Sequence, residues 1–150
     1  MDSVKVRWGG SRQFVGWDER GHGVVMDAKP EYKGEGTGTR PLEVFLYALA
    51  GCTGMDVISI LEKKRQDVRH FEMQVEAQQR EDDYPKIYTD IHVHYVVTGF
   101  GVKEAAVARA IELSDEKYCS VKGMLGPQTI VRTTFEVREA PAPTDSESKR

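Results

Sequence analysis

The chain has 150 residues, 39% of them hydrophobic and 30% charged, which is typical of a single soluble globular domain. Its net charge of −3 provides no basic surface for nucleic acid or anionic lipid. Two cysteines are too few for a disulfide scaffold or a four-thiolate zinc site. The apolar run at residues 44–51 is too short to span a bilayer, and the first residues lack an apolar signal region. We therefore expect a cytoplasmic protein with no membrane or nucleic-acid partner.

The first forty residues indicate a small meander followed by a loop. Three short stretches have strand character, at residues 4–8, 13–17 and 22–26, and turn residues separate them. Residues 28–40 are charged and contain three glycines, which predicts a loop. We expect three antiparallel strands.

A long apolar helix is predicted over residues 42–65. Pro41 suits its first turn, where the missing N–H has no consequence, and its basic end complements the helix dipole. A helix of about 24 residues is about 36 Å long, whereas a domain of this size is only about 30 Å across. Its first half is also apolar on nearly every side. We therefore expect a homodimer that buries this helix between subunits.

The second half of the chain indicates two long strands, a helix and a last strand. Apolar and polar residues alternate over residues 71–77 and 87–97, which predicts a hairpin with one buried face. Residues 102–118 contain no glycine or proline and predict a helix, and residues 131–137 alternate again. The order β-β-β-α-β-β-α-β predicts an α+β domain, with antiparallel sheet packed on helices, over residues 1–139. Residues 140–150 have the composition of a disordered tail.

The two cysteines are the candidate reactive groups. Cys52 lies in the long helix between Gly51 and Gly54, and Cys119 follows the second helix. Each by itself is either a small buried hydrophobic residue or a nucleophile. A reactive thiolate needs a nearby cation, and among the cations of the chain Arg12 is the best placed. Together, the two cysteines suggest a peroxidatic and resolving pair.

Two segments carry a resemblance to a known family. Residues 41–57, PLEVFLYALAGCTGMDV, and residues 116–121, EKYCSV, place the second cysteine 67 residues after the first. In these motifs and in element order the chain resembles the OsmC/Ohr family over residues 3–138. The resemblance implies an intertwined homodimer whose antiparallel sheets wrap around central helices. It also implies a cysteine-based peroxidase, active on organic hydroperoxides in oxidative stress, that uses no metal, haem or flavin.

The resemblance also implies roles for four residues. Cys52 would attack the peroxide and become a sulfenic acid, and Cys119 would condense with it to a disulfide that an external dithiol reduces. Arg12 would stabilise the Cys52 thiolate, and a glutamate after the helix-opening proline would hold the arginine. Here Leu42 takes that position and Glu43 follows it, about half a turn around the helix from Cys52.

The residues leave two alternatives to the peroxidase function open. Leu42 in place of the family's glutamate favours a non-catalytic protein that binds a hydrophobic small molecule at the dimer interface. The other alternative is a thiol redox sensor that forms the disulfide without rapid turnover. His92 and His94 share a strand face, but the set lacks a further ligand, so we expect no metal site.

Overall fold

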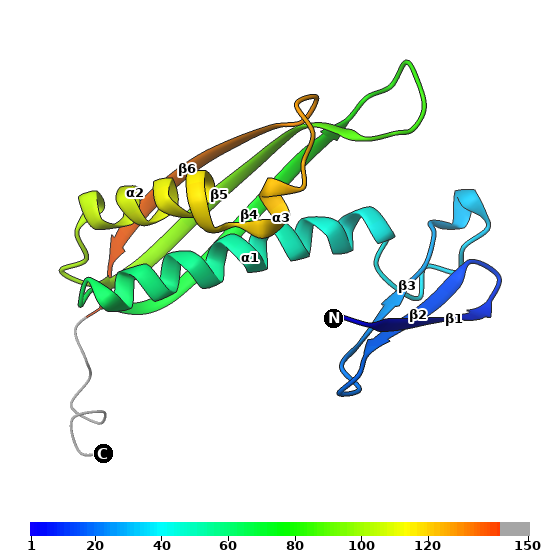
Figure 1. Ribbon diagram of the computed structural model, residues 1–150, viewed down its shortest axis with the longest axis horizontal. Coiled ribbons are helices and arrows are strands. Elements are labelled where there is room, and N and C mark those ends of the chain that lie inside the picture. The colour runs from blue at the N-terminus through cyan, green and yellow to red at the C-terminus, as the bar shows by residue number, and fades with distance from the viewer. Residues whose placement is uncertain (142–150) are drawn as a thin grey trace. The chain divides into compact units, whose positions relative to one another are not determined.

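The computed structural model describes residues 1–141 and divides the chain into two compact units, Met1–Ala48 and Leu49–Arg150 (Figure 1). All but two residues of the predicted tail at residues 140–150 lie outside the described residues. The expectation of one domain over residues 1–139 stays a prediction.

The first unit is built on a three-stranded antiparallel sheet. Its strands are β1 (Val4–Gly10), β2 (Gln13–Asp18) and β3 (Gly23–Met26), hydrogen-bonded in that order, which confirms the predicted meander. Among residues 1–48 only Gly16 and Asp27 are buried. One face of the sheet leaves apolar side chains exposed, namely Val4, Val6, Trp8 and Phe14. This sheet therefore has no apolar core of its own.

The Asp27 carboxylate organises the loop between β3 and the long helix. It accepts hydrogen bonds from the backbone N–H groups of Ala28, Glu35 and Thr37 and from the Thr37 hydroxyl, at 2.7 to 3.1 Å. These bonds lower the pKa of Asp27. The loop also contains the short 3₁₀ helix η1 (Pro30–Tyr32). Gly34 is required because a Cβ there would lie 1.9 Å from the Ala28 carbonyl oxygen.

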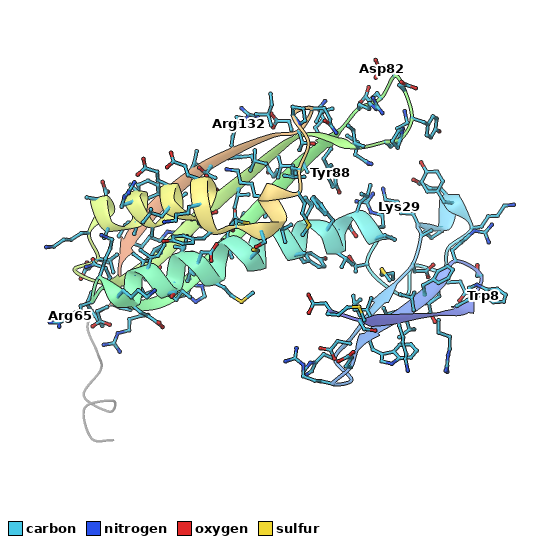
Figure 2. All side chains as sticks on the ribbon, viewed as in Figure 1. Trp8, Lys29, Arg65, Asp82, Tyr88 and Arg132 are labelled. Carbon is cyan, nitrogen blue, oxygen red and sulfur yellow. The ribbon has the colours of Figure 1, made fainter. Side chains whose placement is uncertain are left out.

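Helix α1 (Pro41–Lys63) confirms the predicted long helix and has a capping motif at each end. At its start, the Glu43 carboxylate accepts from the backbone N–H of Arg40 at 2.8 Å, which is one half of a capping box. At its end, Arg65 adopts a left-handed φ of 55°. The N–H of Arg65 bonds the Glu62 carbonyl and that of Gln66 bonds the Leu61 carbonyl, a Schellman motif. Figure 2 shows Arg65 just beyond the helix.

The two glycines beside Cys52 play different parts in α1. A Cβ on Gly54 would lie 2.5 Å from the methyl carbon of Met73, so Gly54 lets the helix approach the sheet closely. A Cβ on Gly51 would meet nothing within 4 Å. The helix is continuous through both.

The second unit packs helices on a mixed sheet of strands β4 (Asp67–Gln79), β5 (Tyr88–Phe100) and β6 (Ile130–Glu139). Strands β4 and β5 form the predicted antiparallel hairpin, but β6 pairs with β5 in parallel. The expectation of a wholly antiparallel sheet was therefore wrong for this pair. The physical reason is the connection, because the helical crossover carries the chain from the end of β5 back to the end of the sheet where β5 begins, so that β6 runs in the same direction.

The crossover contains three helical pieces where one helix was predicted. They are α2 (Glu104–Leu113), the π-helical turn η2 (Ser114–Tyr118) and α3 (Ser120–Gly123). Figure 1 shows α1 and α2 running along the sheet. The core of this unit consists of the fully buried Leu49, Val57 and Leu61 of α1, Ile91, Tyr95 and Val97 of β5, and Val107 and Ala110 of α2.

Helix α1 is more apolar than the short run at residues 44–51 indicates. By length and composition alone it could cross a membrane, although only 28% of its most apolar 18-residue window is buried within the chain. Leu42, Tyr47 and Met55 are exposed on it. An exposed apolar surface of this kind is typical of a site that binds another protein, a ligand or a membrane.

Candidate functional site

The second unit brings the two cysteines together. Cys52 is half-buried in the middle of α1, and Cys119 is buried at the N-cap of α3. Both are free thiols, and the Cys52 side chain lies close enough to Cys119 to raise the pKa of the Cys119 thiol. The fold therefore makes neighbours of two cysteines that are 67 positions apart in the chain, and we refer to them as the dithiol.

Burial keeps the Cys119 thiol protonated. It raises the pKa of Cys119 to about 11, and the neighbouring Cys52 side chain and the negative charge of Asp56 act in the same direction. One group opposes them, the backbone N–H of Lys122, which donates to the Cys119 sulfur at 3.4 Å. At neutral pH Cys119 is therefore a thiol, and it must lose a proton before it can act as a nucleophile.

A π-helical turn positions Cys119 and links it to α1. The N–H of Cys119 donates to the carbonyl oxygen of Ser114 at 2.9 Å, five residues back. The hydroxyl of the same fully buried Ser114 donates to Asp56 Oδ2 at 3.0 Å. Asp56 follows Cys52 by four residues and so shares its side of the helix. Ser114 thus holds the Asp56 carboxylate beside the dithiol.

Further polar groups surround the dithiol from the crossover and the sheet. Asp115 forms an ion pair with Lys122 at 3.1 Å and accepts from the Thr133 hydroxyl at 3.3 Å. The Tyr95 side chain is fully buried, and burial raises the pKa of its phenol to about 12. The hydroxyl of Thr53 lies beside this phenol but donates to the carbonyl oxygen of Ala50 at 3.1 Å.

An open groove lies beside Asp56. Its volume is about 330 Å³, and Asp56 lies in its wall. The other lining residues are Ser59, Ile60, Lys63 and Lys64 from α1 and its end, with Leu113 and Tyr118 from the crossover. Asp56 therefore touches both solvent, through this groove, and the buried Ser114.

Arg12 and Glu43, the other two predicted site residues, belong to the first unit. Arg12 lies in the turn between β1 and β2, where its guanidinium donates to the Ser11 carbonyl oxygen at 3.2 Å. Glu43 bonds the Arg40 guanidinium at 2.7 Å and the Thr39 hydroxyl at 3.0 Å. These bonds, that from Arg40 first, lower the pKa of Glu43 to about 2. The described contacts thus give Glu43 a partner in Arg40, and its role at Cys52 stays a prediction.

His92 and His94 lie on the polar face of β5. Each has a ring nitrogen within hydrogen-bond distance of the Thr134 hydroxyl, at 2.8 and 2.7 Å. Among residues 1–141, no three His, Cys, Asp or Glu side chains converge as a metal site.

Sequence reasoning missed three of the groups around the dithiol. The sequence does carry a signal for Tyr95, because it is the one tyrosine in the apolar series of the alternating residues 87–97. Ser114 and Lys122 gave no signal, since their importance arises from the π-helical turn. A wide turn of this kind has no simple sequence pattern.

Comparisons with known proteins show the family to which the chain belongs. The chain matches the family of OsmC-like proteins over residues 34–134, more than half of its length, and it belongs to that family. It is 41% identical over 134 residues to protein YhfA of Escherichia coli K12, a match that covers 89% of this chain and 96% of YhfA.

Two solved structures have a similar fold. A hypothetical protein from Aquifex aeolicus is 32% identical with a TM-score of 0.81, and the match covers 94% of this chain and 98% of that one. The organic hydroperoxide resistance protein OhrB of Bacillus subtilis is 20% identical with a TM-score of 0.59, covering 92% and 98%. At that identity the likeness to OhrB concerns the fold alone.

Proposed function

We propose that this protein reduces organic hydroperoxides through the Cys52–Cys119 dithiol. The observation that carries the proposal is that two free thiols are neighbours in the second unit, close enough for Cys52 to raise the pKa of Cys119. Two neighbouring thiols can form a disulfide when their Cα atoms lie within about 7 Å of each other. The names of relatives in the same family, such as the hydroperoxide resistance protein of Bacillus subtilis, indicate the oxidant.

The reaction would proceed in three balanced steps. The Cys52 thiolate attacks the outer peroxide oxygen, the O–O bond breaks, and the alkoxide takes a proton and leaves as the alcohol, with Cys52 now a sulfenic acid. The Cys119 sulfur attacks the Cys52 sulfur, and the hydroxyl group leaves as water when it takes a proton. An external dithiol then reduces the disulfide and is itself oxidised.

Exposure supports this order of events. Cys52 is the more accessible of the two, while Cys119 is buried and its pKa is about 11. A peroxide therefore reaches Cys52 first, and Cys119 waits as the protonated resolving group. Arg12 and Glu43 keep, within this proposal, the roles of thiolate-stabilising cation and its support.

The proposal includes a cytoplasmic homodimer. The dimer is supported by apolar side chains that a single chain leaves exposed, among them Tyr47 and Met55 on α1 and Trp8 on the first sheet. A second copy of the chain would bury them. Burying apolar area of this kind stabilises by about 25 cal/mol per Å². Sedimentation at micromolar concentration tests the dimer directly.

The test of the activity is consumption of cumene hydroperoxide with a dithiol as reductant. Cys52→Ser should abolish turnover. Cys119→Ser should consume one equivalent per chain and then stop as a sulfenic acid, which dimedone traps and mass spectrometry detects. A wild-type protein that consumes peroxide no faster than Cys52→Ser would contradict the proposal and favour the binding of a hydrophobic small molecule.

The electrostatics of the site favour a second candidate, a thiol redox sensor. The Asp56 carboxylate and burial both hold Cys119 in its protonated form, and a slow resolving step suits a sensor better than a turnover enzyme. Stoichiometric disulfide formation without catalytic turnover in the same assay would select this function.

A further inference from the structure

The proposed function does not say which group takes the proton of the Cys119 thiol in the resolving step. Cys119 attacks as a sulfur nucleophile, yet it is buried, and its pKa is about 11. Less than about one chain in a thousand carries this thiolate at neutral pH by ordinary acid–base equilibrium. Some group must take the proton as the new S–S bond forms.

We infer that the Asp56 carboxylate is the proton acceptor of the Cys119 thiol when Cys119 attacks oxidised Cys52. The inference rests on the disulfide of the proposed function and adds a residue to it. In the step, the Cys119 S–H bond breaks, its electron pair forms the S–S bond, and the proton moves to Asp56. The leaving group departs from the Cys52 sulfur with the electron pair of its own bond, and Asp56 then releases the proton to water in the groove.

Three features of the structure place Asp56 for this role. It lies one helical turn after Cys52, on the same side of α1. Its Oδ2 is held by the Ser114 hydroxyl, and Ser114 also accepts the N–H of Cys119, so one buried residue ties the carboxylate to the thiol segment. Asp56 also lines the groove, which supplies the exit for the proton.

The other groups around the thiol are less suited to accept the proton. Asp115 is neutralised by Lys122 and already accepts from Thr133. Tyr95 is fully buried, and its phenol is protonated because its pKa is about 12. The titratable and charged groups that face the site from each element are Cys52, Asp56, Lys63 and Lys64 of α1 and its end, Tyr95 of β5, Asp115 and Tyr118 of η2, and Lys122 of α3.

The test isolates the attack of Cys119 without any peroxide. The reagent 5,5′-dithiobis(2-nitrobenzoate) converts the more exposed Cys52 to a mixed disulfide and releases one equivalent of coloured thiolate. Cys119 then displaces a second equivalent as it closes the Cys52–Cys119 disulfide. In Cys119→Ser only the first equivalent should appear, which assigns the second phase to Cys119.

The variant Asp56→Asn gives results of opposite sign for the two roles that Asp56 can have. Asparagine keeps an oxygen for the Ser114 hydroxyl but cannot take a proton. If Asp56 is the acceptor, the second phase at pH 7 slows by about 10- to 100-fold. If Asp56 is only a charged neighbour, its removal lowers the pKa of Cys119 and the second phase becomes faster. An unchanged or faster second phase overturns the inference.

The pH profile gives a second measurement that needs no variant at Asp56. With an internal acceptor, the second phase of the wild type is nearly independent of pH from about 6.5 to 9. Without one, it rises about tenfold per pH unit toward the Cys119 pKa of about 11, and such a rise in the wild type overturns the inference. Asp56→Asn should show that rise, so its rate approaches that of the wild type at high pH.

The matched control is Asp115→Asn, the other carboxylate of the cluster. Because Lys122 already neutralises Asp115, we expect its second phase to stay within about twofold of the wild type. A slowing as large as that of Asp56→Asn would assign the effect to the cluster as a whole and overturn the inference. Since no peroxide is used, failure of the hydroperoxide assay and failure of this inference are separate results.

Discussion

Replacing Glu43 by glutamine tests the electrostatic start of α1. The carboxylate accepts from the Arg40 backbone, the Arg40 guanidinium and the Thr39 hydroxyl, and its pKa falls from 4.5 to about 2. By linkage, a decrease of this size corresponds to at most about 3 kcal/mol of stability. Because 34% of the Glu43 side chain remains exposed, solvent screening reduces this to about 1 kcal/mol.

The sign of the pH dependence follows from the depressed pKa. Glu43 stabilises the folded chain above its unfolded pKa of 4.5, and this stabilisation is lost as the pH falls toward 2. We therefore expect Glu43→Gln to be less stable than the wild type by about 1 kcal/mol at pH 7 and nearly equal to it at pH 2.5. Glutamine still accepts the Arg40 N–H, so the capping box itself is retained.

The assay is urea unfolding followed by circular dichroism at one fixed protein concentration, at pH 7, 4 and 2.5. Glu62→Gln is the matched control, since Glu62 is exposed near the other end of α1, where the helix dipole disfavours a carboxylate. A loss for Glu43→Gln that is the same at all three pH values would refute the electrostatic argument. An unchanged stability at pH 7 would refute it equally.

Three further predictions concern stability. Arg65→Gly should stabilise the chain by about 0.5–1 kcal/mol in urea unfolding, because the residue at this helix end has a φ of 55°; a loss of stability would contradict the capping argument. Tyr95→Phe should leave the melting temperature unchanged or raised, because the hydroxyl has no hydrogen-bond partner among the described residues; a clear decrease would show that it has one. Leu61→Ala, at a fully buried position, should lose about 2–5 kcal/mol in urea unfolding, and a loss below 1 kcal/mol would mean that the helix does not pack as described.

Most elements were predictable because their signals are local. The alternation with period two located β4 and β5, although both extend beyond the predicted residues, since strand ends carry little apolar pattern. Pro41 and the basic end located α1 to within two residues. The single helix predicted at residues 102–118 is divided because its last part widens to a π-helical turn, which residue composition does not distinguish.

The dithiol site was predicted only in part, for a reason that lies in chain topology. The sequence identified Cys52 and Cys119 and their likeness to a family, but not their proximity. That proximity depends on the crossover that makes β6 parallel to β5 and brings the π-helical turn against α1. Ser114 and Tyr95 also lie near the two thiols because of the tertiary fold, and their positions in the sequence do not indicate it.

By itself, the sequence determined which elements form and singled out the two thiols as candidates, because hydrophobic period, turn residues and cysteine context act over a few residues. Tertiary structure alone decided that the two thiols are neighbours and that Asp56 is held beside them by Ser114. These facts depend on the approach of segments up to 67 residues apart. Local preference does not encode such an approach, which results from burying the apolar faces of α1, α2 and the sheet together.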